Sequence, residues 1–406
     1  MNPGDSIPLR AARWLAFASA VAILLSIAAS QILLGLALAA LLLSGEKLRL
    51  PRIWLPLGLF LLGTLISLAF SEDPAAGLPQ VRKIFVFCEL LIVFSSLRDA
   101  ALIRWLFFTW AGFATITGLR GIVQFSQKIQ QAQQAGSDSY HYYVGERITG
   151  FMSHWNTFSA QEMVALIMIA AFLLFAPVAG KRMWMCIACV AVIGTAVVLA
   201  ETRAVWIGAA LAALYLLWFR RRWLVALAPG AILLAYLVSP PVIRARFDSL
   251  MHPTSVDSNQ FRLVTWRTGL RMIQAHPWLG LGPEIPRIQF EKWIPADVPR
   301  PLPSGSYIHL HNMYLQYAAE RGIPTMLMMM WLIGQVMWDF SWGLRTLPSG
   351  PSQRRFLLHG GIAVMIATLA EGMAEYNLGD TEVLTMFLVV VACGYLALEK
   401  DVVSQP

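Results

Sequence analysis

The stretch Tyr307–Pro324, YIHLHNMYLQYAAERGIP, joins a long polar segment to a long apolar one. It holds a close histidine pair, His309 and His311, and then a run with helical character from Asn312 to Glu320. The apolar residues beyond it extend this run over 313–340, which is long enough to cross a bilayer as a helix. The stretch therefore predicts a membrane helix that directly follows a polar segment with two histidines.

The rest of the chain repeats this alternation of apolar runs and short polar gaps. Of its 406 residues, 57% are hydrophobic and only 13% are charged, whereas soluble proteins are nearer one quarter charged. We predict an all-α, polytopic membrane protein in which 1–406 form a single integral membrane domain. About twelve transmembrane helices are expected, near 13–29, 31–43, 54–70, 84–97, 101–122, 157–176, 183–200, 204–219, 223–239, 313–340, 356–371 and 382–398.

The formal charge of +8 is better explained by topology than by a nucleic-acid partner. Most basic residues lie at the ends of apolar runs, and Arg220–Arg222 is the strongest such signal. With the N-terminus in the cytoplasm, the positive-inside rule places the longer polar segments 123–156 and 240–312 on the outer side. The chain has no phosphate-binding glycine motif of the nucleotide-binding type, so no nucleotide is expected as a partner.

The two outer segments differ in their local patterns. In the longer one, Leu263–Gln274 has helical periodicity, and a proline-rich stretch follows it. Loops of this length are usually functional. In the shorter one, Asn156 is expected to cap the helix that follows.

Four cysteines all lie in apolar runs. Cys186-x-x-Cys189 has the spacing of a metal or redox motif, but it lies inside an expected span and no second pair accompanies it. We interpret these cysteines as small core residues.

Three arginines are candidates for binding phosphate. Arg203 lies in a very short link between two spans, and Arg262 and Arg267 lie on the long outer segment. Arginine forks match phosphate oxygens in geometry and stay charged. The alternative is that Arg203 reaches the lipid headgroups or pairs with Glu201, and that the other two are ordinary loop residues.

His311 is expected to start the tenth span, where the helix dipole favours the neutral imidazole that a general base requires. The negative charge of a nearby pyrophosphate would instead favour the protonated imidazolium. His309 should then point elsewhere. The alternatives are an interfacial histidine bound to a backbone carbonyl, or a metal ligand. Because the acidic residues of the loop lack metal-site spacing, no metal is expected.

Acidic residues occur at two further places. Glu320 and Arg321 are expected to pair with each other. The last outer turn carries four acids that could attract a cation or a polar acceptor, but the preferred interpretation is a solvated loop; they are Glu371, Glu375, Asp380 and Glu382.

Together these motifs resemble the O-antigen ligase and polymerase superfamily. The pattern there is an Arg, then His-Pro-x-x-Gly-x-Gly-Pro, His-x-His-Asn-x-Tyr-Leu-Gln and Glu-x-Gly. The matching residues here are Arg262, His276–Pro283, His309–Gln316 and Glu320–Gly322. Thr202-Arg203-Ala is similar to the family's short arginine link, and Gly150-Phe with His-Trp-Asn156 to its entry into the sixth span.

This resemblance implies a metal-independent, inverting glycosyltransferase in the bacterial inner membrane, with its active site facing the periplasm and no cofactor. The donor would be a glycan on undecaprenyl pyrophosphate, and the acceptor of a ligase would be a sugar hydroxyl of the lipid A core. His311 would be the base, and Arg203 and Arg262 would neutralise the leaving pyrophosphate. Arg267, His309, Glu320 and Arg147 are the further substrate-binding candidates.

Three other functions remain open. A polymerase of the same superfamily would use a second lipid-linked glycan as acceptor, and a protein O-oligosaccharyltransferase would use a protein. A lipid-linked glycan transporter would need charged or broken helices near the bilayer midplane, whereas the charges here gather at the outer face.

Overall fold

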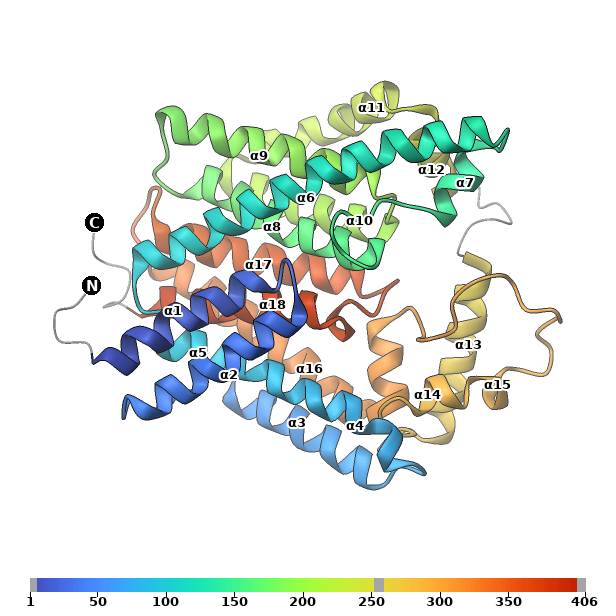
Figure 1. The fold of residues 1–406 in the computed structure, drawn as a ribbon, viewed down its shortest axis with the longest axis horizontal. Helices are drawn as coiled ribbons and strands as arrows, with labels where there is room; N and C mark the ends of the chain where they lie inside the picture. The colour runs from blue at the N-terminus through green and yellow to red at the C-terminus, as the bar shows by residue number, and fades with distance from the viewer. Residues whose placement is uncertain (1–5, 252–258, 400–406) are drawn as a thin grey trace.

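The computed structural model describes residues 6–251 and 259–399, and all regular structure within them is helical (Figure 1). Of these helices, six are long and apolar enough to cross a membrane: α6 (Ala100–Gln134), α8 (Trp155–Phe175), α9 (Gly180–Leu199), α10 (Arg203–Arg220), α16 (Met313–Thr346) and α18 (Thr381–Leu398). Shorter apolar helices are α2 (Ile27–Leu43), α3 (Trp54–Ala69), and the pair η2 (Arg222–Leu227) and α11 (Ala228–Val238). The prediction of an all-α, polytopic membrane protein is confirmed, although six rather than twelve helices meet both criteria.

The N-terminal helices differ from the predicted spans. The expected span 13–29 is wrong, because α1 (Ile7–Ala22) ends at Ala22 and α2 begins at Ile27. Ser26 enforces this break, since its side chain accepts a hydrogen bond from the Ala29 N–H at 3.3 Å and caps α2. The expected span 84–97 is divided into η1 (Lys83–Phe87) and α5 (Cys88–Ser96).

The core lies where α8, α18 and α17 (Gln353–Glu371) pack against one another. Most residues of α18 and α8 are buried there. Helices α9 and α11 lie at the edge of the bundle (Figure 1) and expose large apolar side chains, among them Trp184, Ile232 and Leu234. Such side chains suit contact with lipid.

The two long polar segments are partly helical. α6 continues to Gln134, so it includes the first residues of 123–156, and α7 (Ser139–Gly145) follows. His154, not Asn156, caps α8, because its Nδ1 accepts a hydrogen bond from the Asn156 N–H at 3.2 Å. The longer segment contains α12 (Pro241–Met251), α13 (Asn259–Ala275), α14 (Ile285–Ile288) and α15 (Phe290–Trp293). α13 confirms the helix expected over Leu263–Gln274, and residues 252–258 lie outside the described part.

A sharp kink divides α16, where Gly322 has φ 80° and ψ 161°. The loop 277–282 docks here through three backbone hydrogen bonds: Leu281 N to Ala319 O (2.9 Å), Gly282 N to Glu320 O (2.9 Å) and Ile323 N to Pro277 O (2.8 Å). A Cβ at Gly322 would lie 2.0 Å from the carbonyl oxygen of Trp278. A Cβ at Gly280 would likewise lie 2.4 Å from the Glu320 carbonyl carbon, so this close backbone contact explains Gly280 of one motif and Gly322 of the other.

Candidate functional site

His311 lies in a tight turn just before α16. Its φ of 47° is in the left-handed region, which a residue other than glycine rarely adopts outside sites where the surroundings enforce it. Asn312 is the N-cap, and its Oδ1 accepts a hydrogen bond from the Leu315 N–H at 3.0 Å. The expectation that His311 occupies the first helical turn is therefore wrong, because the cap follows it. From α13, Trp266 Nε1 donates to the His311 carbonyl at 3.2 Å and fixes the turn.

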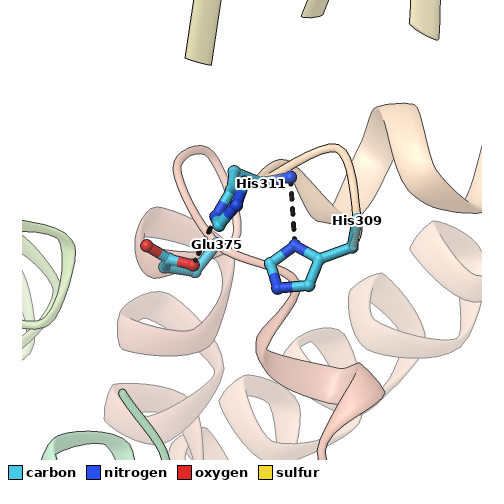
Figure 2. Close-up of side chains that lie close together, drawn as sticks. All are labelled: His309, His311 and Glu375. Atoms are coloured by element: carbon cyan, nitrogen blue, oxygen red, sulfur yellow. Dashed lines mark hydrogen bonds and ion pairs between the residues drawn. The ribbon is translucent and has the colours of Figure 1, made fainter. Parts of the chain in front are cut away.

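The turn after α17 packs against this segment. The Met313 N–H donates to the Gly372 carbonyl at 2.8 Å, and Asn312 Nδ2 donates to the Met373 carbonyl at 2.9 Å. These bonds bring the buried Glu375 to His311, with Oε2 3.2 Å from Nδ1 (Figure 2). The solvated-loop interpretation is wrong for Glu371 and Glu375, whose exposed fractions are 1% and 5%.

The second histidine lies close to the first, as Figure 2 shows. His309 Nδ1 accepts a hydrogen bond from the His311 N–H at 3.2 Å, and the ring centroids are 4.0 Å apart. The expectation that His309 points elsewhere is wrong, because the left-handed turn folds the backbone back. Burial, together with the neighbouring His311, lowers the pKa of His309 to about 3, so this ring is neutral near pH 7.

Arg262 on α13 forms an ion pair with Glu375 through Nη2 and Oε1. Burial alone would raise the pKa of Glu375, but Arg262 and the hydrogen bond from His311 outweigh burial and lower it to about 2. Glu375 is therefore ionised, and one carboxylate contacts both Arg262 and His311.

The other nitrogen of His311 also has a partner. Nε2 lies 2.9 Å from the Ser306 carbonyl oxygen, so both ring nitrogens face oxygen acceptors. A neutral ring has one N–H and leaves one of these contacts without a proton. When Nδ1 donates to Glu375, the Nε2 lone pair faces the Ser306 carbonyl oxygen, which a substrate hydroxyl would have to replace.

Donor atoms of His309, His311 and Glu375 lie within 4.8 Å of one another, a spacing that could hold a metal ion. However, Arg262 neutralises Glu375, and both nitrogens of His311 already face protein oxygens. These contacts describe a hydrogen-bonded network among the three side chains, and the expectation of a metal-free site stays a prediction.

Further arginines surround the link between α9 and α10. Glu201 has φ 53°, and its carbonyl accepts from Arg246 Nε at 3.1 Å and from Arg147 Nη1 at 3.4 Å. Arg203 is buried and donates from Nη1 to the carbonyl and the hydroxyl of Ser249 on α12, at 3.1 and 3.2 Å. Arg203 thus lies inside the protein rather than at the lipid headgroups.

Electrostatics connect these arginines to the histidine turn. Burial and the charge of Arg246 lower the pKa of Arg147 to about 9, while Glu201 and Glu375 oppose this shift and Arg262 adds to it. Burial also lowers the pKa of His154, and Glu375 partly offsets that effect. The charge of Glu375 therefore affects both Arg147 and His154, and that of Arg262 affects Arg147, so these two side chains lie near the histidine turn.

Two predicted substrate-binding residues lie apart from this cluster. Arg267 is half-exposed and pairs with Asp297 at 2.6 Å. Glu320 forms the expected pair with Arg321 at 2.6 Å and accepts a hydrogen bond from Gln316 at 2.8 Å. Its contacts belong to the docking of the loop against α16, and its role in substrate binding stays a prediction.

Sequence reasoning missed Arg246 and undervalued Glu375. Arg246 lies in the unremarkable stretch Val242–Asp248 and carried no signal. Glu375 carried one weak signal, since a carboxylate between two apolar runs is costly to place in a membrane protein without a role.

Residues 187–330 match the model of a family described as O-antigen ligase. The match runs from α9 into α16 and so includes Arg203, Arg262, His309 and His311, but neither Arg147 nor Glu375. The chain therefore carries an O-antigen ligase family domain, which ligases and polymerases acting on lipid-linked glycans share. No curated protein matches the chain.

Proposed function

We propose that this protein is an O-antigen ligase of the bacterial inner membrane, with its site facing the periplasm. It transfers O-polysaccharide from undecaprenyl pyrophosphate to a sugar hydroxyl of the lipid A core, with inversion and without a metal. The family domain supports transfer of a lipid-linked glycan. The observation that carries the proposal is the buried His311 just before a membrane helix, hydrogen-bonded to Glu375, which is itself the ion-pair partner of Arg262.

The chemistry needs one proton acceptor and strong positive charge. The acceptor hydroxyl gives its proton to His311 Nε2, and its oxygen forms a bond to the anomeric carbon of the donor. The bond from that carbon to the pyrophosphate oxygen breaks, and its electron pair leaves with the pyrophosphate. Attack opposite the leaving group inverts the configuration.

The arginines serve the leaving group. Arg203 and Arg262 are proposed to bind the pyrophosphate, with Arg147 adding positive charge nearby. Fixed charges in a buried site stabilise the developing anion without having to reorganise. Pyrophosphate is already a good leaving group, so positioning and charge account for most of the required catalysis.

The Ser306 carbonyl marks where the acceptor would bind. It lies 2.9 Å from His311 Nε2, the position that a substrate hydroxyl must take. The segment around Ser306 must therefore move away from His311 Nε2 before the acceptor can bind.

Purified protein in liposomes tests the proposal. We would supply undecaprenyl-pyrophosphate-linked glycan with lipid A core and resolve the products on a gel. Joined product is expected from the wild type, and His311→Ala should lose it by a factor of about 10²–10⁴, as for a missing general base. Longer chains from donor alone would instead identify a polymerase, and near-normal transfer by His311→Ala would refute the base assignment.

A further inference from the structure

The buried carboxylate of Glu375 contacts both the proposed base, His311, and one of the proposed pyrophosphate-binding residues, Arg262. Glu375 Oε2 lies 3.2 Å from His311 Nδ1, and Oε1 forms the ion pair with Arg262. Glu375 is 5% exposed, so water does little to screen either contact. A change in the charge or position of Arg262 should therefore alter the hydrogen bond between Glu375 and His311.

A donor pyrophosphate would change what Arg262 does. Arg262 Nε has no hydrogen-bond partner within the described residues. The side chain is 16% exposed, so a phosphate oxygen can approach the guanidinium beside Glu375. A phosphate bound there competes with Glu375 for the same positive charge. As Arg262 neutralises Glu375 less, the carboxylate becomes a stronger acceptor for the Nδ1 proton of His311.

We propose that Glu375 is a positioning residue that couples donor binding to activation of His311. Glu375 accepts the hydrogen bond from the Nδ1 proton, which leaves the Nε2 lone pair for the acceptor. This hydrogen bond becomes stronger when a bound pyrophosphate competes with Glu375 for the charge of Arg262. The base is then most effective only when a donor is present. This inference rests on the proposed function, since it needs a pyrophosphate-linked donor and His311 as base.

A purely structural role for the carboxylate is the competing explanation. However, the turn after α17 is already tied to α16 by the bonds from Met313 N to Gly372 O and from Asn312 Nδ2 to Met373 O. Neither bond uses the Glu375 side chain. The ionised carboxylate is therefore free to act on its two partners, Arg262 and the His311 ring.

Glu375→Gln tests the coupling, because it keeps the shape and removes the charge. The kcat for transfer should fall at least about fivefold, in the range of ordinary coupling between sites. The KM for the donor should fall as well, because Arg262 no longer shares its charge. Titration with undecaprenyl-pyrophosphate-linked glycan in the absence of acceptor should show the same tighter binding. Glu375→Asp should recover part of the kcat.

Glu371→Gln is the matched control. Glu371 is a buried carboxyl one helical turn earlier, and it accepts a hydrogen bond from Asn377 Nδ2 at 3.0 Å. Its substitution should leave kcat and donor KM near their wild-type values. Melting curves in detergent check that each variant is folded, and Glu375→Asp provides the comparison if Glu375→Gln is not.

The outcomes separate the inference from the proposed function. A wild type that neither binds nor uses the pyrophosphate-linked donor would refute the proposed function. A wild type that transfers normally, with Glu375→Gln showing an unchanged kcat or a raised donor KM, would refute only the coupling. Failure of Glu375→Asp to recover any kcat when folded would also count against the coupling.

Discussion

Replacing Gly322 by alanine tests whether the kink in α16 holds the site together. Gly322 has φ 80° and ψ 161°, a region that is essentially restricted to glycine, where another residue costs about 1–3 kcal/mol. The new Cβ would also lie 2.0 Å from the Trp278 carbonyl oxygen and 2.3 Å from its carbon. Forcing the two backbones apart adds about 1–3 kcal/mol, so a total destabilisation of about 2–6 kcal/mol is expected.

The effect should reach the chemistry as well as the stability. The loop at 277–282 continues from α13, and α13 holds the His311 turn through Trp266. Gly322→Ala should therefore lower both the melting temperature in detergent and the transfer activity in liposomes. Gly334→Ala is the control in the same helix, because a Cβ at Gly334 meets nothing within 4 Å. Equal melting temperatures and equal activities for the two variants would refute this reasoning.

Three other predictions use different perturbations. Arg203→Lys should lower transfer about a hundredfold, because an ammonium cannot replace the guanidinium fork; wild-type rates in the liposome assay would exclude a role for the fork. EDTA should leave the transfer rate unchanged, whereas a loss that added divalent ions restore would reject the metal-free mechanism. The depressed pKa of Glu375 gives stability that is present above its ordinary value of 4.5 and is lost as the pH falls toward about 2. The melting temperature of the wild type should therefore fall over this range by more than that of Glu375→Gln, and parallel curves would contradict the assignment.

The sequence was most informative about the helices. Apolar runs predicted all six helices that are long and apolar enough to cross a membrane, because burial in lipid requires long stretches of apolar residues. The sequence analysis failed where a single side chain determines where a helix ends. At Ser26, a helix cap divides one apolar run into two helices. Length alone could not reveal that break.

The site was predictable only in part. Arg262 and the two histidines stand out because charged and titratable residues are few in this chain. Their arrangement depends on the backbone of His311, which places His309 against it. Glu375 lies 64 residues beyond His311, and no local pattern links the two. Contacts of that kind arise from packing between helices, which a single sequence does not display.

The position of Glu375 late in the chain has a consequence for biosynthesis. The His311 turn is completed by bonds to Gly372, Met373 and Glu375, all of which follow α17. Because a chain enters the membrane from its N-terminus, the growing polypeptide carries its arginines and histidines for some time without this final partner. If Glu375 positions His311 as proposed, the site is complete only after α17 and the turn that follows it have been made and inserted.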